Sequence, residues 1–262
     1  MWGTGRMMVW VPALTLVGIV SGWIMGTSAA AWGALSVPLL ILLGVEPLAA
    51  ISSSLAASVI LSLFGGLTHW RYDRSRLEPL TPLLLGGCAG AVLGSIVSPM
   101  LSPSTLGLFI GVTTLSAGLL ALFRRKAVSS GDTRGEETVK WQDRRATLAG
   151  VGVVAGFFAG AFGAGWGTIG VALLVRTGIP PHAVVGSSLA ARSLVSLTAV
   201  GSYAVQWHLA PPAVFVPLLL GGGAGVYFGV RTANGFSAKG LRIFLGVMIT
   251  VVGALTMGKV LW

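Results

Sequence analysis

Long apolar blocks, almost free of charged residues, are the feature that most constrains how this chain can fold. Most of them approach the ~20 residues that a helix needs to cross a hydrocarbon layer of ~30 Å. Hydrophobic residues make up 54% of the 262-residue sequence and charged residues only 9%, whereas a soluble domain is about 25% charged. The composition excludes a water-soluble globular enzyme and predicts an all-α polytopic membrane protein.

The carboxylates lie outside the apolar blocks. Four of the seven fall in one polar stretch between residues 132 and 143, and the others are Glu46, Asp73 and Glu78. Cation and proton pathways usually carry buried carboxylates, so the sequence disfavours a cation pump or antiporter. The net charge of +10 is explained by basic loops on the cytoplasmic side and does not indicate nucleic acid as a partner.

A single cysteine, Cys88, excludes an internal disulfide and a Cys-rich metal site. We expect no cofactor and no metal. The expected partners are the lipid bilayer and a small anionic substrate, with a homo-oligomer as a further possibility. Cys88 is flanked by glycines, which favours a small packing residue over a reactive thiol.

The two halves of the chain share a pattern at an offset of 134 to 135 residues. Trp32-Gly33 matches Trp166-Gly167, and the run 82–87 matches the run 217–222. A fixed offset across many positions indicates an internal duplication. We predict a first transmembrane repeat at residues 1–123, a cytoplasmic linker at 124–146 and a second repeat at 147–262.

Each predicted repeat consists of an interrupted apolar segment and three continuous blocks. The interrupted segments, at about 13–43 and 147–177, carry Gly/Ala/Ser clusters midway that break helices readily. We expect each to form a broken, re-entrant helix pair. The continuous blocks predict transmembrane helices at about 49–69, 79–98 and 105–123, and at about 182–204, 213–231 and 241–260.

The basic residues favour inverted repeats. If the broken segments are re-entrant, the repeats are inverted and only Arg6 and Lys259 lie outside. Fourteen basic residues then face the cytoplasm, namely Arg71, Arg74, Arg76, seven between Arg124 and Arg145, Arg176, Arg231, Lys239 and Arg242. If the segments span once, the repeats are parallel and the last four of these lie outside. The positive-inside rule favours the inverted arrangement without excluding the parallel one.

The two breaks are candidate anion sites. A helix broken at membrane depth must be buried in protein or line a wet cavity, and its free N–H groups and positive dipole end favour an anion. The alternative is that the small residues only permit close helix packing. The candidate residues are Trp32, Gly33, Gly165, Trp166, Gly167 and Thr168.

Serine pairs follow each break, and the second pair is followed by an arginine. Ser53-Ser54 and Ser187-Ser188 could donate to an oxyanion, or could simply cap the next helix. Arg192 lies near the middle of its apolar block, where a guanidinium costs at least ~2.5 kcal/mol unless it faces protein, water or an anion. We expect it to contact substrate or its counter-ion, with a structural contact to backbone carbonyls as the alternative.

Glycines recur every four residues in one block of each half. Gly86, Gly90 and Gly94 are echoed by a set at 221, 225 and 229, and Gly22 and Gly26 repeat the spacing. This is the small-xxx-small pattern of close helix contact in membranes. We expect a structural role for these positions.

The motifs together resemble the sulfite exporter TauE/SafE family of bacterial and archaeal membrane transporters. They are the Gly-rich break and short apolar helix from Trp32 to Leu40, the turns at 43–47 and 177–181, the Ser-Ser-Leu runs at 53–55 and 187–189, and the Gly-x-x-x-Gly helix. The resemblance covers nearly the whole chain. It implies a prokaryotic cell-membrane transporter of a small sulfur-containing anion such as sulfite, a sulfonate, sulfate or thiosulfate.

On this basis we expect a secondary transporter that works by alternating access, and not an enzyme. An anion channel is the main alternative, because it would use the same helix dipoles. A transporter of another small organic anion is a second alternative. A membrane-embedded enzyme would need a nucleophile–base or metal constellation that the sequence does not contain.

Overall fold

The computed structural model describes residues 4–28, 31–72, 80–123, 145–170, 181–232, 235 and 237–262. Within these ranges every regular element is helical, as the composition predicts. The first half contains α1 (Thr4–Ser28), α2 (Trp32–Leu42), α3 (Pro47–Tyr72), α4 (Leu80–Val97), η1 (Ser98–Met100) and α5 (Pro103–Phe123). The second contains α6 (Arg145–Phe162), η3 (Trp166–Gly170), α8 (Pro181–Val205), α9 (Pro212–Thr232) and α10 (Ala238–Leu261). Residues 124–144 of the predicted linker lie outside the described residues.

Seven of the described helices are long and apolar enough to cross a membrane, namely α1, α3, α4, α5, α6, α9 and α10. Helix α8 has 25 residues and so a length of about 37 Å, which also suffices for a crossing. It is more polar because it carries Arg192 and several serines. Large apolar side chains such as Leu120, Val205 and Leu220 are exposed on the outer faces, as expected where lipid is the solvent.

Both predicted breaks are present. In the first half, α1 ends at Ser28 and α2 begins at Trp32, after Ala31 in the left-handed conformation with φ 65°. In the second half, α6 ends at Phe162 and Gly163 has φ 69°. The chain then enters η3, a single π-helical segment. Helix α1 begins nine residues earlier than the predicted segment, and with 25 residues it is itself long enough to span.

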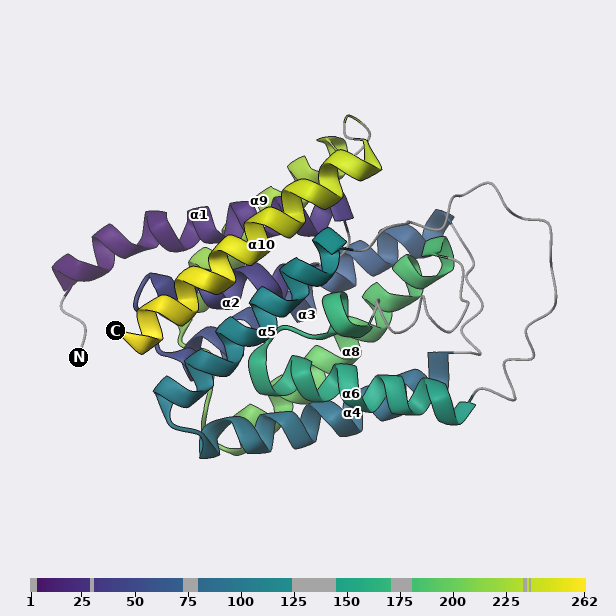
Figure 1. Cartoon of the computed structure of the whole chain (residues 1–262), viewed down its shortest axis with the longest axis horizontal. Coiled ribbons are helices and arrows are strands. Elements are labelled where there is room, and N and C mark those ends of the chain that lie inside the picture. The colour runs from purple at the N-terminus through teal and green to yellow at the C-terminus, as the bar shows by residue number, and fades with distance from the viewer. Residues whose placement is uncertain are drawn as a thin grey trace.

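Two pairs of helices run parallel and in close contact. Along α1 the glycines at 18, 22 and 26 meet α9 at positions 218, 222 and 226 in turn, and along α4 those at 86, 90 and 94 meet α6 at 149, 153 and 157. A Cβ atom at any of these glycines would collide with backbone atoms of the partner helix. The predicted structural role of the glycine stripes is confirmed. Figure 1 shows α4 and α6 together along one edge of the molecule and α1 beside α9 at the opposite edge.

Two other pairs run antiparallel. Helices α5 and α10 form the first of these pairs. Residue numbers increase along α5 as they decrease along the facing side of α10: the contacts are Gly107 with Val260, Gly111 with Met257 and Gly118 with Thr250. Helices α3 and α8 pack together in the centre, where Ser58 and Val59 meet Ser196 and Ser193. The short helix α2 packs against α1, α3, α5 and α10, so the first break lies inside the bundle.

Candidate functional site

The two breaks in the chain meet in the protein interior. Gly33, in the first turn of α2, lies directly against the carbonyl oxygen of Gly163, the residue that follows α6. Ala31, Ala34 and Ala164 belong to the same buried cluster. Ala31, the residue before α2, makes no side-chain cap, and the first turn of α2 is buried at this junction. This contact is consistent with the prediction that a helix broken at membrane depth is buried in protein.

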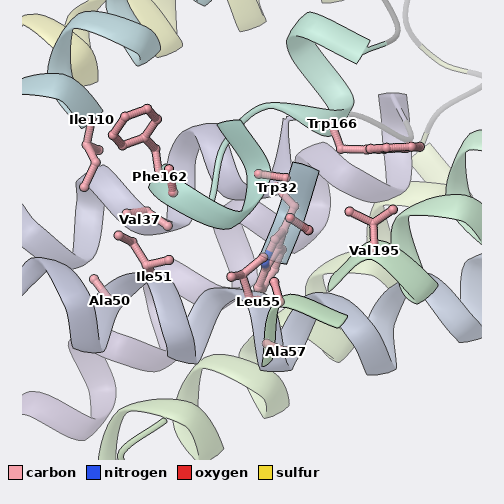
Figure 2. Close-up of a cluster of buried hydrophobic side chains, with 14 of the residues drawn as sticks. Trp32, Val37, Ala50, Ile51, Leu55, Ala57, Ile110, Phe162, Trp166 and Val195 are labelled. Carbon is pink, nitrogen blue, oxygen red and sulfur yellow. The ribbon is translucent and has the colours of Figure 1, made fainter. Parts of the chain in front are cut away.

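Each of the two tryptophans at the breaks packs against a glycine of the other half. A Cβ atom at Gly222 of α9 would lie 2.8 Å from both Trp32 Cη2 and Leu61 Cδ1. Trp32 is fully buried, and its Nε1 donates a hydrogen bond of 3.1 Å to the carbonyl oxygen of Ser54. Figure 2 shows Trp32 beside Leu55 in the centre of this cluster.

Trp166 has a matching environment. A Cβ atom at Gly87 of α4 would lie 2.7 Å from Trp166 Cζ3 and 2.8 Å from Val195 Cγ2, and Figure 2 places the indole next to Val195. Gly165 and Gly167 are buried beside it. Thr168 lies within η3, although its side chain is outside the described residues. Both tryptophans therefore belong to the packed interior and not to an interfacial belt.

The serine pairs lie inside helices and not at their ends. Helix α3 begins at Pro47, so the interpretation of Ser53 and Ser54 as helix caps is wrong. The Ser54 Oγ lies 2.7 Å from the Ser36 Oγ of α2. The Ser53 Oγ is buried and has no hydrogen-bond partner among the residues that the structure describes.

The second serine pair is also inside a helix. Ser187 and Ser188 follow the start of α8 at Pro181, so their interpretation as caps is wrong too. Their side chains lie outside the described residues. Their role as substrate ligands therefore stays a prediction.

Arg192 is the one strongly charged group buried in the centre of the described helices. It lies on α8, and only 6% of its surface is exposed. Its NH1 nitrogen is buried and has no hydrogen-bond partner within the described part of the chain. The nearest carboxylates in sequence, Asp143 and Glu137, lie more than 45 residues away and outside the apolar blocks. A buried guanidinium without a counter-charge destabilises the fold unless an anion or water compensates it.

Three further serines of α3 and α8 are not among the candidates predicted from the sequence. Ser58 and Ser62 follow Ser54 at intervals of four along α3, and Ser196 follows Arg192 at the same interval along α8. All three are buried. The signal that could have found them is the offset of 134, which pairs Ser58 with Arg192 and Ser62 with Ser196.

Comparison with known proteins agrees with the predicted class of membrane transporter. Residues 14–256 match the sulfite exporter TauE/SafE family. Two proteins of Bacillus subtilis, the probable membrane transporter proteins YjnA and YtnM, are 25% and 24% identical over 92% of this chain, covering 97% and 80% of their own lengths. A probable membrane transporter protein of Xylella fastidiosa is 28% identical over 72% of this chain and 69% of its own.

No solved structure matches the chain. The family match extends over almost all of the sequence, and it includes both breaks, the serine pairs and Arg192. The helices that it covers are long and apolar enough to cross a membrane several times. The chain belongs to the sulfite exporter TauE/SafE family and is a multi-pass membrane transporter of the bacterial cell membrane.

Proposed function

We propose that this protein is a secondary transporter that moves a small sulfur-containing anion across the cell membrane by alternating access. The observation that carries the proposal is Arg192, a buried guanidinium whose NH1 has no partner among the described residues. Sulfite, sulfonate, sulfate and thiosulfate all present oxygen atoms that suit the planar fork of arginine. The family name gives the substrate class independently of this observation.

We further propose that the two halves are inverted repeats. Corresponding helices that cross on a two-fold axis run antiparallel when the axis lies in the membrane plane, and parallel when it follows the membrane normal. The corresponding pairs α3–α8 and α5–α10 are both antiparallel. The contacts at the two glycines also correspond. Gly222 packs against Trp32 and Leu61, and Gly87 packs against the equivalent residues of the other half, Trp166 and Val195. Inverted repeats place a substrate site near the midplane, between the halves.

The breaks would supply the backbone part of the site. The start of α2 at Trp32 and Gly33, and the corresponding run Gly165, Trp166, Gly167 and Thr168, would direct N–H groups towards an anion. Ser53, Ser54, Ser187 and Ser188 would add hydroxyl donors. Arg192 would supply the charge. In this arrangement the tryptophans fix the geometry of the breaks, because both indoles are held against glycines of the other half.

The transporter acts without covalent chemistry on its substrate, and its partners are the anion and the lipid bilayer. A channel is the alternative that would use the same groups. Flux through a carrier saturates and shows counterflow, because each cycle moves a bound substrate, whereas a channel gives single-channel current. Counterflow without such current in planar bilayers is the result expected for this protein.

A binding experiment with matched arginine variants tests the proposal. A ligand that binds only the folded state raises the melting temperature, so the purified protein is heated with sulfite, sulfate, thiosulfate, methanesulfonate, chloride or acetate. We expect at least one sulfur anion to stabilise the wild type and to lose this effect in Arg192→Gln. Arg231→Gln is the control, because Arg231 is exposed and stacks on Tyr227 at 4.3 Å. If none of the sulfur anions stabilises the wild type, the proposal is wrong.

A further inference from the structure

The crossing of α3 and α8 has a defined antiparallel register. The Ser196 Oγ lies 3.5 Å from the Ser58 Oγ, and the Ser193 Oγ donates to the Val59 carbonyl oxygen at 3.3 Å. In an antiparallel pair, four residues forward on one helix correspond to four residues back on the other. The turn of α3 that carries Ser62 therefore faces the turn of α8 that carries Arg192, since residues four apart share a helix face.

Several polar groups at this crossing have capacity to bind a ligand. Ser62 is fully buried, and its Oγ has no partner within the described ranges. The NH1 nitrogen of Arg192 is also buried and also has no hydrogen-bond partner within the described ranges. The contact between Ser58 and Ser196 is much longer than the ~2.7–2.8 Å of a good O–H···O bond. Two buried atoms that lack partners on facing turns require a common explanation.

The chemistry of these groups fits an oxyanion. A guanidinium only donates hydrogen bonds, and a serine hydroxyl can donate one. Arg192 and Ser196 on α8 can therefore donate hydrogen bonds, as can Ser58 and Ser62 on the facing turns of α3. No carboxylate of the chain lies in α3 or α8, so a cation would find no counter-charge here.

The charge of the site is set by an asymmetry between the halves. The position that corresponds to Arg192 in the first half is Ser58, which is uncharged, so the crossing carries one positive charge in place of two. A singly charged anion neutralises this charge. A dianion would leave one negative charge uncompensated in a medium of low dielectric constant, where such a charge is strongly disfavoured.

We propose that Arg192, Ser58, Ser62 and Ser196 form an oxyanion site at the α3–α8 crossing, and that this site selects singly charged anions such as hydrogensulfite or a sulfonate over dianions such as sulfate. The inference rests on the proposed function, and it adds three ligands and the charge of the substrate. The serine ligands and Arg192 lie on the two helices that pair across the two halves, so both halves contribute to one site.

Uptake into proteoliposomes that contain the full-length protein tests the charge selectivity. Sulfite, methanesulfonate and sulfate are compared at equal concentration. We expect kcat/KM for methanesulfonate to exceed that for sulfate at least tenfold. We also expect sulfite uptake to fall as the pH rises through the second ionisation of sulfite, which converts the monoanion into the dianion. Methanesulfonate keeps a single charge throughout, so its uptake should stay level and control for titration of the protein.

Variants separate the charge from the hydroxyls. Ser58→Arg adds a second guanidinium at the corresponding position, and we expect it to raise the ratio of sulfate to methanesulfonate uptake at least tenfold. Ser62→Ala should lower methanesulfonate uptake about tenfold, whereas Ser62→Thr, which keeps the hydroxyl, should retain most of it. Ser21→Ala is the control, because the Ser21 Oγ is also buried without a described partner but lies on α1, which packs along α9.

The outcomes distinguish this inference from the proposed function. Equal uptake of sulfate and methanesulfonate that depends on Arg192 overturns the charge selectivity and leaves the transport function in place. Full activity of Ser62→Ala overturns the assignment of the hydroxyls, and does so even if Ser58→Arg fails to fold. If neither these three anions nor thiosulfate is taken up, the proposed function itself is wrong.

Discussion

At the scale of single residues, the tryptophan contacts make a prediction about neighbouring glycines. Gly222 and Gly223 are adjacent on α9, but a Cβ atom at Gly222 would meet Trp32 and Leu61 at 2.8 Å, whereas one at Gly223 would meet nothing within 4 Å. Gly222→Ala should therefore lower stability by about 1–3 kcal/mol through overpacking. Gly223→Ala should be neutral or slightly stabilising, because alanine has the higher helix propensity.

The measurement is the melting temperature of both variants in the same detergent, followed by anion binding. We expect Gly222→Ala to melt earlier and to bind sulfur anions more weakly, because Trp32 anchors the start of α2. A Gly222→Ala protein as stable as Gly223→Ala would show that Trp32 is not held by this contact.

The candidate residues differ in how visible they are in the sequence. Arg192 could be selected at once, because a guanidinium inside an apolar block has few ordinary explanations. Ser58 and Ser62 are harder to select, because serines are common in membrane helices and often bond to the backbone of their own helix. In the sequence, only the offset of 134 links them to Arg192 and Ser196. Their significance comes from the register between α3 and α8, which belongs to neither segment alone.

At the scale of helices, α2 is held at its C-terminal end by a lysine from the last turn of α10. The Nζ of Lys259 donates to the carbonyl oxygens of Ile41 and Leu42 at 3.0 and 2.9 Å. The Ile41 carbonyl oxygen also accepts a hydrogen bond from the Gly44 N–H at 2.8 Å, and both carbonyls lie at the negative end of the helix dipole. Lys259 thus fixes the end of the short helix whose start lies at the break.

Removing this contact should loosen α2 locally. Lys259→Met keeps the length of the side chain but not its charge, and we expect a loss of about 1–2 kcal/mol in stability. Amide hydrogen exchange should become faster in the segment 39–45. Lys239→Met is the control, since Lys239 is exposed at the other end of the same helix. Unchanged exchange in 39–45 would contradict the anchoring role.

The helix boundaries could be predicted well where the sequence marks them. The six continuous blocks agree with α3, α4, α5, α8, α9 and α10 to within three residues at each end. Four of these helices begin with proline, which favours the first helical position. The start of α1 at Thr4 is not predictable from the apolar pattern, because Arg6 and two nearby glycines interrupt it.

At the scale of the whole molecule, the direction of each helix decides between inverted and parallel repeats. The antiparallel pairing of α5 with α10 places the turn before α5 and the C-terminal end of α10 at the same end of the bundle. In the inverted arrangement both of these ends lie outside the cell, in agreement with the count of basic residues. In the parallel arrangement they would lie on opposite sides of the membrane, so this packing supports the proposal of inverted repeats.

Cysteine labelling in intact cells tests this orientation. In a Cys88→Ser background, single cysteines are introduced by Ser102→Cys, Leu209→Cys, Ala146→Cys and Gly235→Cys, all at exposed positions outside or at the ends of the long helices. A membrane-impermeant maleimide should label the first two without lysis and the last two only after lysis. Labelling of Leu209→Cys on the side opposite to Ser102→Cys would require parallel repeats. That result would also contradict the proposal that Arg192 of α8 lies near the membrane midplane between two inverted halves.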